Sequence, residues 1–171
     1  DRIVPLEHAI YLDYLPSFLK KKAGASSEKF NNAPIVFSTK GTPFDTKLYT
    51  DTVNHVKKTY QGLSRTQIIN NIIEYLDLNM LTPAIFFIFS RKGCEKIANK
   101  VSHNLLRENE PALVDKLVHD YLRTTDNYQK YIKLQQFSHL KKCLDKGFAY
   151  HHSGLLPVFK ELVEMLFGHK D

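Results

Sequence analysis

The sequence predicts an α/β fold in which parallel strands are flanked by helices, and three observations support it. Residues 84–89 form a continuous apolar run, which is typical of a strand buried on both faces of a parallel sheet. A turn and an amphipathic helical pattern follow this run directly, as in a β-turn-α unit. The strand-like run 148–150 is also followed by a turn, after which Pro157 opens a helix.

The N-terminal part of the chain gives weaker signals. Residues 3–12 are expected to be extended, because Pro5 excludes a helix there. Residues 20–27 predict a solvated loop, whose three lysines form either a solubilising surface or a binding patch. Gly41 and Pro43 indicate a turn, and residues 46–60 are then expected to be helical.

Helical patterns dominate from Ser64 onwards. Ser64 and Gln67 match a capping box, and apolar residues recur at helical spacing as far as Met80, before Pro83. Further helices are expected at residues 92–106, 109–122, 128–144 and 157–167.

The bulk composition is that of a globular protein. The chain has 171 residues, of which 43% are hydrophobic and 25% charged. A formal net charge of +6 favours a polyanionic partner. Cys94 and Cys143 lack CxxC spacing, so no disulfide framework is predicted. The longest apolar run is too short to cross a bilayer, so no membrane partner is expected.

The first candidate site is Ser90-Arg91-Lys92, directly after the predicted strand 84–89. Open α/β sheets bind ligands at the carboxyl ends of their strands, and the N-terminus of a helix attracts anions. Ser90 could donate a hydrogen bond to a phosphate, and Arg91 could donate two. The alternative is that Ser90 caps a helix beside an ordinary surface arginine.

The second candidate site is the loop His151-His152-Ser153-Gly154. It takes the equivalent place after the run 148–150, Gly154 permits close approach of a backbone, and Ser153 could cap the next helix. One interpretation is a second phosphate-facing loop. The other is a turn with one packed and one solvated histidine ring.

Catalytic and metal sites have little support. His139 and Cys143 are four residues apart on a predicted helix, but no recognised zinc spacing is present. The sequence has no G-x-x-x-x-G-K-[ST] loop and no acidic pair that ends a strand. We therefore expect no catalytic residues, no bound metal and no ATP hydrolysis from this chain alone.

Three segments resemble one family, the superfamily 2 DExH-box RNA helicases of the Ski-like, exosome-associated class. HHSGLLP at residues 151–157 and the K-E-x-V-E-x-L-F pattern at residues 160–167 are the most specific. PAIFFIFSRKGCEKIA at residues 83–98 resembles motif IV, and RIVPLEHAIYL at residues 2–12 resembles the lead-in from the first RecA-like domain.

The resemblance implies part of a second RecA-like domain, with a P-loop NTPase-type architecture. It implies three parts: a lead-in strand (1–16), an unmatched insertion (17–62), and a partial helicase C-terminal domain (63–171) with inserted helices at about 109–146. The parent protein would use ATP and Mg²⁺ through motifs outside this chain. The RNA-backbone-binding residues would be Ser90, Arg91, Lys92, His151, His152, Ser153 and Gly154.

The implied partners are single-stranded RNA of any sequence, the remainder of the helicase chain and RNA-decay machinery, in an intracellular (cytoplasmic or nuclear) setting. Two alternatives stay open: a non-catalytic, helicase-derived RNA-binding or scaffold module, and a DNA helicase of the same superfamily. With two predicted strands in the sequence, we also expect the isolated chain to expose apolar surface and to associate with itself.

Overall fold

The computed structural model describes residues 6–12, 34–59 and 64–169, and these form two compact units. The first unit comprises residues 1–75 and the second comprises residues 76–171. The lysine-rich loop expected at residues 20–27 lies outside the described residues, as do the first residues of the expected lead-in strand. No helix in the described part of the chain is both long and apolar enough to span a membrane.

The first unit contains a two-stranded antiparallel sheet. Strand β1 (His8–Ile10) pairs with β2 (Ile35–Ser38), and Ala9 lies opposite Val36. The extended conformation expected around residue 10 is therefore confirmed. Its partner β2 lies in a stretch for which no strand was predicted.

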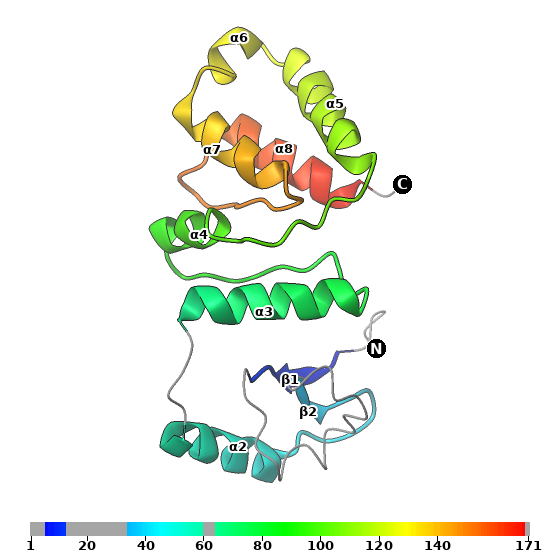
Figure 1. Ribbon diagram of the computed structural model, residues 1–171, viewed down its shortest axis with the longest axis vertical. Helices are drawn as coiled ribbons and strands as arrows, with labels where there is room; N and C mark the ends of the chain where they lie inside the picture. Colours follow the sequence, from blue (N-terminus) through cyan, green and yellow to red (C-terminus); the bar gives the residue numbers. More distant parts are fainter. Residues whose placement is uncertain (1–5, 13–33, 60–63, 170–171) are drawn as a thin grey trace. The chain divides into compact units, whose positions relative to one another are not determined.

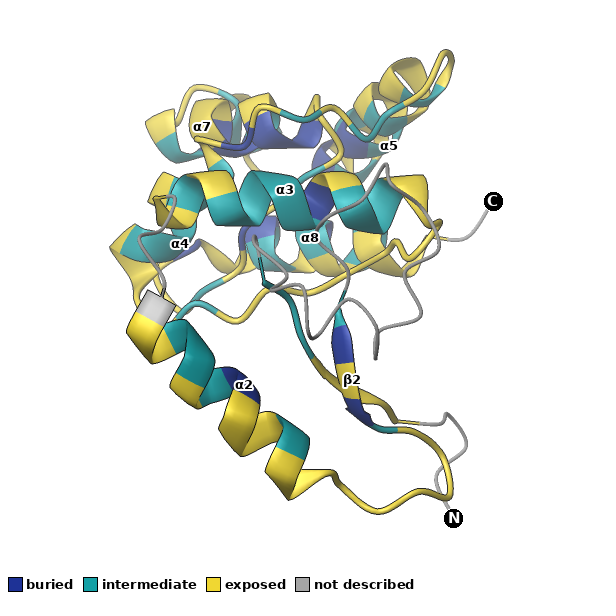
Figure 2. Ribbon diagram, turned by 60° about the horizontal axis from the view of Figure 1, so that its bottom comes forward, coloured by how far each residue is buried: buried dark blue, intermediate teal, exposed yellow. Residues whose placement is uncertain are grey.

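Helix α2 (Thr46–Thr59) follows β2 and confirms the helix expected there. Asp45 caps it, because its Oδ1 accepts the Leu48 N–H at 2.8 Å. Ile35 and Phe37 are buried on alternate positions of β2, whereas the side chain of Val36 is exposed between them (Figure 2). This small core also includes Leu48 of α2.

Helix α3 (Arg65–Leu78) begins with the predicted capping box. Gln67 Oε1 accepts the Ser64 N–H at 2.8 Å, and Ser64 Oγ accepts the Gln67 N–H at 3.4 Å. The helix ends earlier than expected. Met80 lies beyond it, has a φ of 54°, and is 85% exposed.

Four helices form the core of the second unit, and Figure 1 shows them in order along the chain. They are α5 (Glu110–Arg123), α6 (Tyr128–Tyr131), α7 (Gln135–Leu144) and α8 (Pro157–Gly168). Pro111 and Pro157 lie in the first turns of α5 and α8, as predicted. The buried core comprises Val118, Leu122, Phe137, Leu140, Cys143, Leu144, Tyr150, Leu155, Phe159 and Leu162.

The single helix expected at residues 128–144 is two helices, because residues 132–134 separate α6 from α7. The helix expected at residues 92–106 is also shorter, since α4 (Arg91–Ala98) ends before Val101. Lys146 contacts the segment that follows α4. Its Nζ donates to the Val101 carbonyl at 3.1 Å, and its carbonyl accepts the Leu105 N–H at 3.0 Å, so the segment after α4 runs beside residue 146 instead of continuing the helix.

The apolar run 84–89 is not buried, which corrects the expectation from the sequence. Ile85 is 64% exposed, Phe87 82% and Phe89 102%. A strand is buried on both faces only when neighbouring strands and helices cover it, and β1 and β2 form the one sheet found among the described residues. The fold is thus mixed α/β and mostly helical. Parallel strands at residues 84–89 and 148–150 remain a prediction.

Candidate functional site

Ser90 is the N-cap of α4. Its backbone is extended, with φ −158° and ψ 124°, and its Oγ accepts the Gly93 N–H at 3.1 Å. The capping interpretation of Ser90 is therefore correct. Arg91 and Lys92 are the first two residues of the helix, and both are exposed.

These two cations are at the end of α4 that carries the positive partial charge of the helix. The first turn of α4 contains no acidic residue that would offset them. Cations at a helix N-terminus are repelled by the positive end of the helix dipole, and a bound anion relieves this repulsion. The N-terminus of α4 therefore has the electrostatic character of an anion site.

His152 is packed into the structure, and 10% of its side chain is exposed. Its Nδ1 accepts the Gly154 N–H at 3.1 Å, while its Nε2 lies 2.9 Å from Oε1 of Glu95 on α4. Nδ1 thus acts as the acceptor of the ring, and the Nε2–H donates to the Glu95 carboxylate. The ring also stacks on Tyr150, with centroids 5.7 Å apart and planes at 10°.

His151 is more exposed, at 44% of its side chain, and its Nε2 lies 2.8 Å from Oε1 of Glu164 on α8. One ring is thus packed and the other is exposed, as the simpler interpretation of the pair expected. Ser153 and Gly154 are exposed at the tip of the loop. Ser153 does not cap α8: the N-cap of that helix is Leu156, without a side-chain hydrogen bond.

The two candidate segments lie against each other. A Cβ placed on Gly154 would be 3.6 Å from Cδ of Arg91, so the aliphatic part of the Arg91 side chain lies beside the loop. The hydrogen bond between His152 and Glu95 joins the same two segments. Burial raises the pKa of the Cys94 thiol between them, and a hydrogen bond from the backbone of His151 offsets part of that rise.

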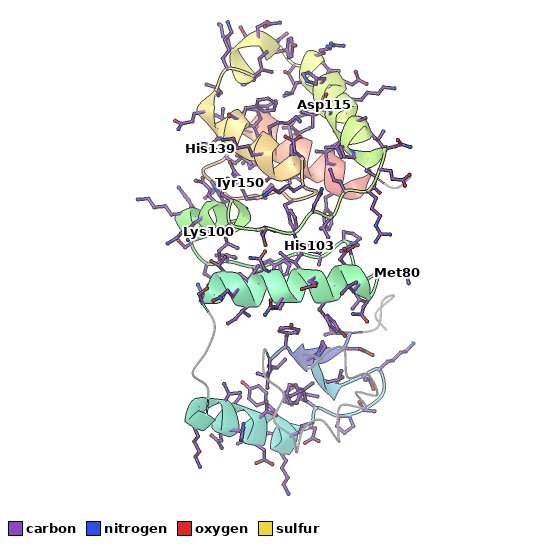
Figure 3. All side chains as sticks on the ribbon, viewed as in Figure 1. Met80, Lys100, His103, Asp115, His139 and Tyr150 are labelled. Carbon is purple, nitrogen blue, oxygen red and sulfur yellow. The ribbon has the colours of Figure 1, made fainter. Side chains whose placement is uncertain are left out.

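Helix α7 supplies a residue that the sequence did not single out, the half-buried Gln136. Its Nε2 donates to the Gly154 carbonyl at 3.1 Å, and its Oε1 accepts the Leu156 N–H at 3.1 Å. Its backbone carbonyl accepts the hydroxyl of Tyr150, a residue labelled in Figure 3, at 3.5 Å. These partners are 14 to 20 residues away along the chain, so no local motif indicates the contact.

Two tyrosines of this unit stay neutral well above physiological pH. Burial, and then the Glu95 carboxylate, raise the pKa of Tyr150 to about 12. Burial and a hydrogen bond to Glu161 raise the pKa of Tyr121 to about 12. Both phenols therefore serve as neutral hydrogen-bond donors within the helical core.

His139 and Cys143 belong to no cluster of metal-ligating side chains among the described residues. Cys143 is buried with its Sγ 3.9 Å from Oδ1 of Asn99, and burial raises the pKa of its thiol. His139, labelled in Figure 3, is exposed on α7. Throughout residues 6–12, 34–59 and 64–169, no three His, Cys, Asp or Glu side chains are grouped so that they could hold a metal ion.

Known proteins similar to this chain are helicases. An uncharacterized helicase of Schizosaccharomyces pombe is 31% identical over 170 residues, which are 97% of this chain and 15% of that protein. The antiviral helicase SKI2 of Saccharomyces cerevisiae is 32% identical over 98 residues, or 57% of this chain and 8% of SKI2.

A DExH-box ATP-dependent RNA helicase of Arabidopsis thaliana is 33% identical over 100 residues, which are 58% of this chain and 10% of that protein. This chain thus spans a small part of each relative. No protein-family profile matches it.

Proposed function

Because the chain belongs to the Ski-like DExH-box helicases of superfamily 2, we propose that it forms part of the second RecA-like domain of an ATP-dependent RNA helicase. In this proposal, residues 84–89 and 148–150 are parallel strands whose neighbouring strands come from the rest of that domain. The exposure of Ile85, Phe87 and Phe89 supports this, because a central strand needs partners on both sides.

The surface formed by α4 and the loop 151–154 binds the RNA backbone. The observation that carries this assignment is the proximity of Arg91 to Gly154, since a Cβ added to Gly154 would lie 3.6 Å from Cδ of Arg91. Arg91 and Lys92 provide cations, and the first turn of α4 provides a positive dipole end. Gly154 is exposed and has no side chain, so its backbone permits close approach of a phosphate or ribose.

Contacts of this kind recognise no base. Phosphate and sugar contacts fix the position of a nucleic acid without reporting its sequence. A helicase that moves along any strand requires this property, and single-stranded RNA of any sequence is accordingly the proposed ligand.

The whole protein would use ATP as its energy source, as the Arabidopsis relative does by its name of ATP-dependent RNA helicase. Mg²⁺ as the partner of ATP belongs to the same proposal. This chain has no G-x-x-x-x-G-K-[ST] loop, so we assign none of its residues to the nucleotide. Its own contribution is to hold RNA. An intracellular location and an association with RNA-decay machinery belong to the same proposal.

The test is the ATPase rate of the full-length protein with RNA, with DNA of the same sequence, and with neither. We expect stimulation by RNA to exceed stimulation by DNA. Equal or greater stimulation by DNA would favour a DNA helicase of the same superfamily. RNA binding without any ATP hydrolysis would favour a non-catalytic scaffold module and contradict the proposal.

A further inference from the structure

Gln136 holds the loop 151–156 at two points with one side chain. Its amide nitrogen donates to the Gly154 carbonyl and its amide oxygen accepts the Leu156 N–H, each at 3.1 Å. The two backbone groups have opposite polarity and flank Leu155, whose side chain is buried. Of the side chains that carry a donor and an acceptor on one planar group, Gln is long enough to reach both from the start of α7.

The loop has a second restraint on its other side. His152 accepts the Gly154 N–H and donates to Glu95, so both backbone polar groups of Gly154 have partners. Gly154 is exposed and has no side chain to hold it in place. Its orientation therefore depends on these two hydrogen bonds, one from α7 and one from the loop itself.

We propose that Gln136 is a positioning residue for RNA binding. It fixes the backbone of Gly154 beside Arg91, so that the loop and the N-terminus of α4 present one continuous surface. The proposal rests on the RNA-binding function assigned above to that surface. Gln136 itself need not touch RNA: it acts through Gly154 and Leu156.

The placement of Gln136 also couples the helical segment before the loop to RNA binding. Gln136 is the second residue of α7, next to the buried Phe137, which stacks on Phe159 with ring centroids 5.7 Å apart. The packing of Phe137 thus fixes the start of α7. The two hydrogen bonds of Gln136 then hold the exposed loop at a defined place relative to α7. A shift of α7 would move the Gly154 carbonyl with it.

The experiment compares three variants of the full-length protein. Gln136→Ala removes both hydrogen bonds. Gln136→Glu keeps the oxygen that accepts the Leu156 N–H but replaces the donor to Gly154 with a carboxylate oxygen. Gln135→Ala is the matched control, because Gln135 is the preceding residue of the same helix and is exposed.

Three quantities are measured: the dissociation constant for single-stranded RNA, the RNA concentration that half-maximally stimulates ATPase, and hydrogen exchange at the Leu156 amide. For Gln136→Ala we expect RNA affinity to fall about fivefold to tenfold, the loss expected for one hydrogen bond. The half-stimulating RNA concentration should rise by the same factor while the ATPase rate at saturating RNA is kept. Exchange at Leu156 should accelerate.

Gln136→Glu should lose RNA affinity while Leu156 stays protected, and Gln135→Ala should behave as the wild type. A thermal melt shows whether each variant is folded. If Gln136→Ala destabilises the protein, Gln136→Met takes its place, because that side chain is uncharged, has nearly the same size and also removes both hydrogen bonds.

Wild-type RNA affinity in both Gln136 variants would overturn the inference, and so would a loss of affinity equal to that of Gln135→Ala. Arg91→Ala, measured in the same series, separates this failure from failure of the proposed function. If Arg91→Ala weakens RNA binding and the Gln136 variants do not, the positioning role is wrong. If Arg91→Ala has no effect, the RNA-binding surface itself is wrong.

Discussion

Nε2 of His152 lies 2.9 Å from Oε1 of Glu95, and this contact joins the loop 151–154 to α4. The two residues are 57 positions apart in the sequence. Because Nδ1 of the same ring accepts the Gly154 N–H, the imidazole has a defined tautomer as well as a defined orientation. A single side chain therefore links both candidate segments and orients the glycine between them.

This geometry predicts that Nε2 of His152 carries a proton and that Nδ1 does not. Long-range proton–nitrogen correlation spectra distinguish the two ring nitrogens, and Nδ1 should have the chemical shift of an unprotonated nitrogen. His139, exposed on α7, serves as the comparison and should show averaged tautomers. A proton found on Nδ1 of His152 would contradict the hydrogen bond from Gly154.

Two substitutions of Ser90 separate capping from RNA binding. Ser90→Ala should lower the free energy of unfolding by about 1 kcal/mol, because the Gly93 N–H loses its acceptor. Ser90→Asp should keep the cap and the stability, since a carboxylate is favoured at the N-terminus of a helix. It should nevertheless weaken RNA binding, because its charge repels phosphate.

The measurements are chemical denaturation and RNA titration, with Ser138→Ala in α7 as a control at an exposed helical serine. Wild-type RNA affinity in Ser90→Asp would mean that the N-terminus of α4 does not face the phosphates.

Asp77 should make part of the stability depend on pH. A hydrogen bond from His103, and then contacts with Arg107, hold the pKa of Asp77 below its ordinary value of 3.8. A carboxylate with a lowered folded-state pKa stabilises the fold above its ordinary pKa, and this contribution is lost as the pH falls through the folded-state pKa. The protein should therefore be more stable than Asp77→Asn above about pH 5.

Denaturation curves from pH 7 downwards test this. The difference in unfolding free energy between wild type and Asp77→Asn should be constant at high pH and should shrink below pH 3.8, the ordinary pKa of the group. A difference that stays constant or grows as the pH falls would contradict the assigned shift.

The exposed segment 84–89 should cause the isolated 171-residue chain to self-associate. Ile85, Phe87 and Phe89 form an apolar strip that water does not solvate well, and an extended segment without a strand partner can pair with another chain. Sedimentation velocity should show mass increasing with concentration.

Phe87→Lys should shift this equilibrium towards the monomer, whereas Phe167→Lys, at an exposed phenylalanine of α8, should not. A wild-type chain that stays monomeric at high concentration would refute the prediction.

Local signals in the sequence predicted local structure well. The capping box at Ser64 and the prolines at 111 and 157 mark helix starts, because each acts within one turn of its own position. Apolar periodicity likewise indicated the buried faces of α5 and α8, where Val118 and Leu162 are buried.

Long-range relationships were not predictable from the sequence. The apolar run 84–89 is compatible with a buried strand, but its burial depends on partners that no local pattern specifies. The expected helix stops at Ala98, and the segment that follows it bonds Lys146, 45 residues away from Val101. Gln136 and Glu95 are also ordinary helical residues in sequence, and their role at the loop becomes visible only once α4, α7 and the loop are together.

The most direct test of the account is the RNA affinity of the full-length protein as a function of salt, compared with that of Arg91→Ala. Arg123→Ala, at an exposed arginine of α5, is the control for the loss of one positive charge. We predict weaker binding for Arg91→Ala and a log–log salt slope smaller by about 0.7, the value for one lost contact with a single strand. Unchanged affinity and an unchanged slope, or equal effects in both variants, would contradict the claim that α4 and the loop 151–154 bind the RNA backbone.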